Sequence, residues 1–312
     1  MDTRVEAGKP LTTQPSLTLA QVLQMYGEEN ACKALLRDQR WPDGVRCPRC
    51  DNKNVYTLRT RPFHWVCKIC GGRNGYRFSV ITKTIFENTN YPLATWFQVI
   101  YLMTQSKNGI SALQIHRQIG SGDYRTAWYM CQRIRAAMTY PDMKALLGDV
   151  EVDETYIGGK AHNRHGGKNK MPIGHGTAGK LPVIGAIARK GNVVCKMIEN
   201  TDTKTLDQFV RRTVDKEKVD LISTDEHSGY RLLGEGPDAL PHEVIRHSSG
   251  EYVRGVVHTN SIESFWSLLK RGIVGTYHKV SKTYLPLYLN EFQFRFNNRN
   301  EANIFFKVIA GC

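Results

Sequence analysis

Three acidic residues that lie far apart in the chain have the chemistry of a magnesium site. They are Asp153 in the segment DVEVDETYIGG, Asp225 in VDLISTDEHSGY and Glu263 in HTNSIESFWSLLKR. Carboxylates are hard oxygen ligands, and several that converge on one point stay ionised only with divalent cations between them. Two Mg²⁺ ions held in this way activate an attacking oxygen and stabilise a leaving one. The chemistry that this set predicts is the cutting and joining of phosphodiester bonds.

Each acid also has a simpler interpretation, since an isolated aspartate usually caps a helix or is solvated. Neighbouring acids compete for the same role, namely Glu151, Glu154 and Glu226. Asp153 is preferred because strand alternation places it opposite Val150 and Val152, ahead of a glycine-rich turn. Asn260 is an expected N-cap with Glu263 at the third helical position. A first-turn glutamate can still project towards a metal ion, so both roles are compatible.

Four of the eight cysteines form two C-x-x-C pairs, Cys47 with Cys50 and Cys67 with Cys70, separated by residues 51–66. This spacing predicts one structural Zn²⁺ bound by four thiolates, with a small hairpin over residues 54–65. So short a segment has little apolar material, and the metal would supply its stability. Basic and aromatic residues surround the pairs and suit a nucleic acid, although a ribbon that docks a protein is the alternative.

Residues 93–138 have the apolar spacing of helices. Glycine-containing turns at residues 106–109 and 120–122 divide them into three, and Asp123 is the expected cap of the last. That helix is predicted to point three arginines outward, Arg125, Arg133 and Arg135. A short helix, a turn and a basic helix form the layout of a helix-turn-helix, whose last helix enters the major groove. Three small helices that only fill a domain are the alternative. An earlier helix is expected over residues 19–37.

The remainder of the chain predicts an α/β domain. Expected strands cover residues 150–153, 181–189, 192–199, 219–223 and 242–246, and expected helices cover 203–214 and 260–270. Three antiparallel strands followed by helix, strand and helix match the order of a ribonuclease-H-like fold. Asp225 follows the fourth strand, where ligands gather at the carboxyl ends of strands in open sheets.

Composition limits the function classes. The 312 residues are 41% hydrophobic, and 43 Lys and Arg against 29 Asp and Glu give a net charge of +14. This charge suits a phosphate-rich partner, or it belongs to a protein that is simply basic. The longest apolar run, residues 93–103, is interrupted by polar residues, so no membrane span is expected. Without an apolar signal core, a cytoplasmic location is expected, where cysteines serve as ligands or core residues.

The motifs together resemble a bacterial insertion-sequence transposase of the DDE type, in the branch with an N-terminal zinc ribbon. The matching segments are RWPDG at residues 40–44, DETYIGG at 153–159, TD at 224–225 with Tyr230, HTNSIE at 258–263 followed by FWSLLK at 265–270, and FRFNN at 294–298. The resemblance covers residues 41–305. It implies an N-terminal helical segment (1–40), a zinc ribbon (41–88), a helix-turn-helix-like DNA-binding domain (89–145) and a ribonuclease-H-like catalytic domain (146–312).

The resemblance further implies a mechanism and partners. Two Mg²⁺ ions held by Asp153, Asp225 and Glu263 would activate water to nick the ends of the element, and the freed 3′-hydroxyl would attack target DNA. Some members of this branch use asparagine as the third residue, so Asn260 competes with Glu263. We favour Glu263, because a carboxylate neutralises Mg²⁺ better than an amide. The partners implied are double-stranded DNA, as terminal inverted repeats and target, and at least a second copy of the chain, in the nucleoid.

Further cations are expected to contact this DNA. The glycine-rich segment 158–180 carries Lys160, Arg164, Lys168 and Lys170, and the helix with Glu263 ends in Lys270 and Arg271. Lys270 and Arg271 are predicted to hold phosphate. Segment 158–180 is predicted to order on DNA, with an ordinary surface loop as the alternative. Two other functions stay open: a structure-specific nuclease or resolvase, and a domesticated DNA-binding regulator.

Overall fold

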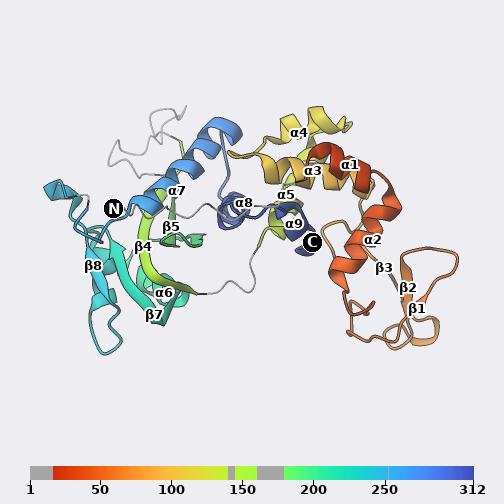
Figure 1. Ribbon diagram of the computed structural model, residues 1–312, viewed down its shortest axis with the longest axis horizontal. Helices are drawn as coiled ribbons and strands as arrows, with labels where there is room; N and C mark the ends of the chain where they lie inside the picture. The colour runs from red at the N-terminus through yellow and green to blue at the C-terminus, as the bar shows by residue number, and fades with distance from the viewer. Residues whose placement is uncertain (1–16, 140–144, 160–178, 252) are drawn as a thin grey trace, which may run out of the picture. The chain divides into compact units, whose positions relative to one another are not determined.

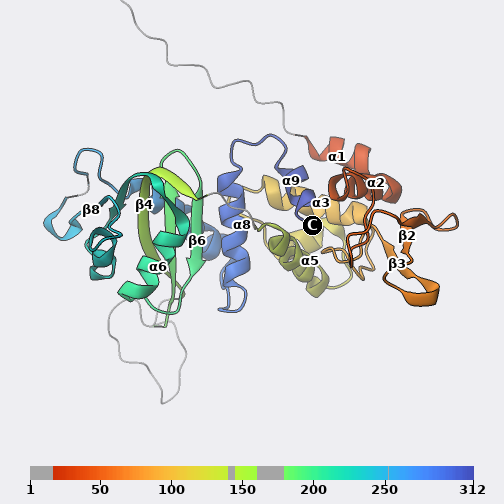
Figure 2. The same ribbon diagram turned by 90° about the horizontal axis from the view of Figure 1, so that it is seen from below.

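The computed structural model describes residues 17–139, 145–159, 179–251 and 253–312. The chain forms two compact units (Figures 1 and 2). One comprises Met1–Gln105, Ala112–Ala137 and Asn298–Cys312, and the other comprises Ser106–Ser111 and Met138–Asn297. The expected ribbon and helical domains therefore share one unit. The residues after Asn297 belong to that unit and not, as expected, to the sheet domain.

The ribbon is a three-stranded antiparallel sheet in the first unit. Its strands are β1 (Tyr56–Thr57), β2 (His64–Cys67) and β3 (Tyr76–Ser79), in the order β1-β2-β3, with the short helix η1 (Gly72–Asn74) between the last two. Trp65 pairs with Phe78 across β2 and β3, and both contact Trp41 in edge-to-face geometry. The predicted hairpin is confirmed by the pairing of β1 with β2. One face of this small sheet is thus buried by aromatic rings.

The expected single helix over residues 19–37 is two helices, α1 (Leu19–Tyr26) and α2 (Glu29–Arg40). Thr18 and Gln21 form a capping box that begins α1. The first helix ends at Tyr26 with Gly27 as its C-cap, and Glu28 has extended backbone angles that a helix cannot contain. The chain direction therefore changes between the two helices, and each buries its own apolar residues.

The other helices of this unit are α3 (Leu93–Gln105), α4 (Ala112–Ile119), α5 (Tyr124–Ala137) and α9 (Ile304–Ala310). Asp123 accepts a hydrogen bond from the Arg125 backbone, as the predicted cap requires. Arg125 and Arg133 are exposed, but Arg135 is only 1% exposed, so its predicted outward position is wrong. The reason is that α5 packs against α3, α4 and α9, which widens its buried face beyond a single apolar stripe.

The second unit contains a five-stranded sheet in the order β6-β5-β4-β7-β8. The strands are β4 (Leu146–Ile157), β5 (Leu181–Ala188), β6 (Val193–Met197), β7 (Val214–Thr224) and β8 (His242–Val244). The strands β4, β5 and β6 are antiparallel neighbours, whereas β7 and β8 run parallel to β4. The central strand β4 therefore joins the two halves of the sheet.

Helices cover both faces of this sheet (Figure 1). They are α6 (Thr203–Thr213), α7 (Asn260–Arg271) and α8 (Leu285–Asn297), with the shorter turns η3 (Ser228–Gly234), η4 (His247–Ser249) and η5 (Gly272–Tyr277). Val150 and Val152 belong to a core with Leu206 of α6, while Trp266 of α7 belongs to the core on the other face. This layered α/β arrangement and element order confirm the predicted ribonuclease-H-like fold.

Helix α7 begins differently from the prediction. Its N-cap position is Thr259, and Asn260 is the first helical residue instead of the expected cap. The free backbone N–H groups of Ser261 and Ile262 donate to the carboxylate of Glu151, at 2.7 and 3.1 Å. An acceptor from the central strand thus replaces the local cap.

A single glycine lets α7 lie close to the sheet. A Cβ atom on Gly185 of β5 would lie 2.6 Å from the Trp266 ring, and real Cβ atoms do not approach other atoms so closely. The close packing of Trp266 therefore requires glycine at this position.

We predict that Gly185→Ala lowers the free energy of unfolding by about 1–3 kcal/mol, because the added methyl group displaces Trp266 and overpacks the core. Chemical denaturation measures the change. Gly159→Ala is the matched control, since a Cβ there meets no atom within 4 Å. Equal stability of the two variants would contradict the packing argument.

Candidate metal centres and catalytic cleft

The four ribbon cysteines converge as the sequence predicts. The Sγ atoms of Cys47 and Cys70 lie 3.8 Å apart, and those of Cys50 and Cys67 lie 3.7 Å apart. All four sulfur atoms lie within 4.8 Å of one another. A regular tetrahedron with Zn–S bonds of about 2.3 Å has edges of about 3.8 Å, so these two sulfur pairs have the separation that a tetrahedral zinc site requires. No fifth ligand position is required, and the site is structural.

Tight turns bring the ribbon sulfurs together. The N–H of Asp51 donates to the carbonyl of Cys47, and Asp51 has a positive φ of 57°. Arg46 forms an ion pair with Asp51 at 2.9 Å. The first C-x-x-C pair is therefore a closed loop whose backbone hydrogen bonds aim both sulfurs at the same point.

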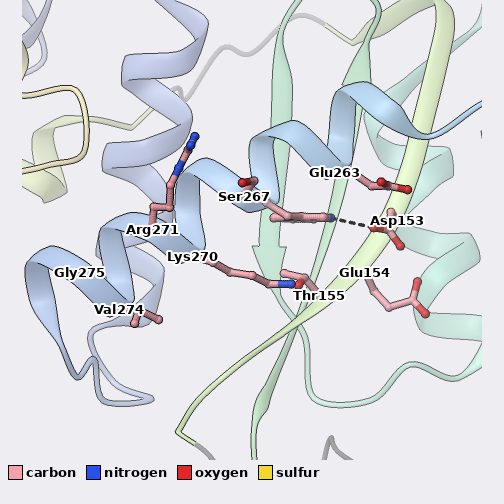
Figure 3. Close-up of a pocket in the computed structure, with 10 residues that line it drawn as sticks. Asp153, Glu154, Thr155, Glu263, Ser267, Lys270, Arg271, Val274 and Gly275 are labelled. Carbon is pink, nitrogen blue, oxygen red and sulfur yellow. Dashed lines mark hydrogen bonds between the residues drawn. The ribbon is translucent and has the colours of Figure 1, made fainter.

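Two of the three predicted acids line one cleft in the second unit (Figure 3). Asp153 projects from β4 and Glu263 from the first turn of α7, and Figure 3 shows both on the same side of the helix. The cleft has a volume of about 710 Å³. Its other lining residues are Glu154, Thr155, Trp266, Ser267, Lys270, Arg271, Val274 and Gly275. Asn260, the alternative third residue, is exposed and does not line the cleft.

Asp225 lies beside this cleft and is not part of its lining. It follows the end of β7, the parallel neighbour of β4, and its charge acts on both Asp153 and Glu154. Within the described residues, the four cysteines are the one group of three or more His, Cys, Asp or Glu whose ligand atoms all lie within 4.8 Å. At least one pair among the three acids is therefore farther apart than this limit.

The surroundings of two cleft acids, Asp153 and Glu154, disfavour their ionised forms. Burial, followed by the charges of Glu154 and Asp225, raises the pKa of Asp153 to about 7. Burial also raises the pKa of Glu154, and Asp225 adds to that rise. Two carboxyl groups of raised pKa beside a third acid are the donor set that a divalent cation relieves.

Hydrogen bonds orient the acids. The indole N–H of Trp266 donates to Asp153 at 3.0 Å, as the dashed line in Figure 3 marks. The hydroxyl of Thr259 donates to Glu263 at 2.9 Å, and that of Tyr230 donates to Glu154 at 2.6 Å. The sequence pattern does not assign a polar role to Trp266, which is buried on α7. Its role as a donor follows from the tertiary fold, although an indole that borders a polar site usually finds an acceptor.

The competing acids have separate roles. Glu151 is fully buried and accepts hydrogen bonds from Arg189 at 3.0 Å as well as from the start of α7. Glu154 reaches the cleft, whereas Glu226 accepts from Ser248 at the surface. Glu151 therefore belongs to the framework, and Glu154 is the competitor that remains beside Asp153.

The predicted DNA-binding cations occupy several places. Lys270 and Arg271 are exposed and line the cleft. Arg125 and Arg133 are exposed on α5. Four further predicted cations lie outside the described residues, namely Lys160, Arg164, Lys168 and Lys170.

Comparison with known proteins places the chain among transposases. Residues 145–297 match the family model of the ISXO2-like transposase domain, and residues 27–73 match the transposase zinc-ribbon domain. The chain is 30% identical over 283 residues to an uncharacterized protein in transposable element ISH50 of Halobacterium salinarum. That alignment covers 88% of this chain and 92% of the relative. The chain belongs to the family of ISXO2-like transposases, and it carries their zinc ribbon.

The helices give no sign of membrane insertion. In the parts of the chain that the structure describes, none has both the length and the hydropathy to cross a bilayer.

We predict that the double variant Cys47→Ser, Cys50→Ser loses the zinc of the ribbon, from about one ion per chain to a small fraction, because half of the thiolate ligands are removed. Metal analysis of the purified protein measures this. The single variant Cys131→Ser is the control, since this cysteine lies in α5 outside the four-cysteine group. Unchanged zinc content in the double variant would refute the site.

We also predict that Asp153→Asn stabilises the metal-free protein at pH 8. The folded state holds the Asp153 proton up to pH about 7, whereas the unfolded chain releases it near 3.8, so stability is lost as the pH rises between these values. Each pKa unit corresponds to about 1.4 kcal/mol, which sets an upper limit of about 4 kcal/mol.

We expect a gain of about 1–3 kcal/mol at pH 8 that shrinks as the pH approaches 5, measured by denaturation at both values. The exposed Asp220 provides the control variant Asp220→Asn. A gain that is independent of pH would show that charge is not its cause.

Proposed function

We propose that this transposase binds the terminal inverted repeats of an insertion sequence, nicks them by metal-dependent hydrolysis and joins the 3′ ends to target DNA. The observation that carries the proposal is one cleft lined by two acids, Asp153 and Glu263, and by two cations, Lys270 and Arg271. Acids to hold metal and cations to hold phosphate on one surface suit a phosphodiester substrate.

In this proposal Asp153, Asp225 and Glu263 hold two Mg²⁺ ions. The raised pKa of Asp153 supports the assignment, because burial and then the charges of Glu154 and Asp225 disfavour its ionised form, and a bound cation would offset that cost. When bound, the metal would lower the pKa of a water molecule or hydroxyl group and stabilise the leaving oxygen. Trp266 fixes one oxygen of Asp153 through its N–H, so the other oxygen remains for a metal.

The phosphate backbone would bind along α7. Glu263, Ser267 and Lys270 recur at helical spacing on its exposed face, and all line the cleft. Arg271 follows at the end of the same helix. A phosphate held by Lys270 and Arg271 would therefore lie in the same cleft as Asp153 and Glu263. These cations position DNA and take no part in bond breaking.

The helices α4 and α5 would recognise the ends. A turn at residues 120–123, with Gly120 at a φ of +62°, joins an eight-residue helix to a fourteen-residue helix. Arg125, Tyr129 and Arg133 recur every four residues on α5, and all three are exposed. This basic and aromatic stripe suits the major groove. The basic ribbon and the cations of segment 158–180 would add contacts to the backbone.

Two ends must be cut and joined together, so the proposed working form is at least a dimer on DNA, in the nucleoid. A structure-specific nuclease with the same cleft would cut without joining. A domesticated regulator would bind the ends and neither cut nor join. The three activities can be separated in one reaction.

The test is an in-vitro reaction of the full chain with labelled transposon ends, target DNA and Mg²⁺. We expect joined products from the wild type. We expect Asp153→Asn, Asp225→Asn and Glu263→Gln each to lower the joining rate by at least about 10³-fold, with end binding within a few-fold of wild type. Asp220→Asn is the control for a surface acid. Normal joining by any of the three variants would mean that its residue is misassigned, and cutting without joining by the wild type would favour the nuclease.

A further inference from the structure

The two strands that lead to Asp153 and Asp225 are hydrogen-bonded over only part of their length. Parallel pairing of β4 with β7 ends at Glu151 and Ser223. Both aspartates lie two residues beyond that last pair. From there each strand is held by its outer neighbour, β4 by β5 and β7 by β8. Backbone pairing therefore does not fix the separation of the two aspartates.

Glu154 bridges this gap with its side chain. Its Oε2 accepts a hydrogen bond of 2.6 Å from the hydroxyl of Tyr230, and its Oε1 lies 3.8 Å from Nε2 of His227. Tyr230 is only 1% exposed, so its ring has one stable position. Since Tyr230 and His227 both follow Asp225 closely in the chain, these contacts tie the end of β4 to the Asp225 segment.

The Asp225 segment is itself stiff. The N–H of His227 donates to the Asp225 carboxylate at 3.1 Å, and the N–H of Gly229 donates to Nδ1 of His227 at 3.1 Å. A Cβ on Gly229 would lie 2.6 Å from Leu206, so the turn is packed against α6. A displacement of Tyr230 would therefore move Asp225 as well.

We propose that Tyr230 is a positioning residue, which holds Glu154 and thereby sets the distance between Asp153 and Asp225. This inference rests on the proposed function, in which the two aspartates share Mg²⁺. Without the Tyr230 hydroxyl, the carboxylate of Glu154 is free to turn, and its repulsion of the neighbouring acids is no longer opposed by a donor. The aspartates would then meet the metal in a less suitable geometry.

The test compares Mg²⁺ binding by the full-length wild type and by Tyr230→Phe, measured by isothermal titration calorimetry. Loss of such an orienting partner typically weakens metal binding by about 10–100-fold, and we expect a loss in this range. At saturating Mg²⁺ the joining rate should return to within about threefold of wild type, because no ligand has been removed. A merely structural loss would lower the maximal rate and would not respond to Mg²⁺.

Tyr156→Phe is the matched control. Tyr156 lies on β4, as Glu154 does, but its hydroxyl is 3.5 Å from that of Thr201. We expect its Mg²⁺ affinity to equal that of the wild type. Wild-type affinity in Tyr230→Phe would overturn the inference.

A second variant tests whether Glu154 is itself a ligand. Glu154→Gln keeps a side-chain oxygen to accept from Tyr230, so its loss of affinity should not exceed that of Tyr230→Phe. A larger loss would identify Glu154 as a ligand and overturn the positioning role. Asp153→Asn distinguishes failure of the proposed function from failure of the positioning role. If Asp153→Asn binds Mg²⁺ as tightly as wild type, the proposed function fails. If Asp153→Asn does not bind Mg²⁺ while Tyr230→Phe binds it normally, only the positioning role of Tyr230 fails.

Discussion

The buried carboxylate of Glu151 fixes the position of α7 on the sheet. Its oxygens accept from the N–H groups of Ser261 and Ile262, from the Ser261 hydroxyl and from Arg189. A fully buried charge is tolerated because these donors and the positive end of the helix dipole compensate for lost hydration. Glu151 lies two residues before Asp153, and it contacts α7 at the two residues that directly precede Glu263. The same interaction therefore brings both cleft acids into register.

The acids of the cleft, unlike Glu151, lie beside other acids. Glu151 has its compensation within the protein. Burial and the nearby charge of Asp225 instead raise the pKa of both Asp153 and Glu154. Such a cluster costs stability in the free protein and gains affinity for a cation that is supplied from outside. This contrast distinguishes Glu151, which stabilises the fold, from the acids of the cleft, although Glu151, Asp153 and Glu154 lie within four residues on β4.

Aromatic packing and the cysteine cluster both stabilise the ribbon of the first unit. The ribbon sheet is small, with Trp65 and Phe78 buried against Trp41 on one face. A zinc ion held by the four clustered sulfurs would supply the cross-link that so short a segment lacks. Helix α9, from the end of the chain, packs against α2 and α3 and completes the core of this unit.

The sequence by itself determined the order of the five strands and of α6 and α7 in the second unit, the cysteine cluster and the face of β4 that carries Asp153. These follow from local rules: residue alternation, helical period and C-x-x-C spacing. Tertiary structure alone decided that Glu151 caps α7, that Arg135 is buried and that residues after Asn297 join the first unit. Glu151 and Ser261 lie 110 positions apart in the chain. No local pattern specifies such a partner, because it is selected by the packing of whole elements and by the cost of leaving a buried charge uncompensated.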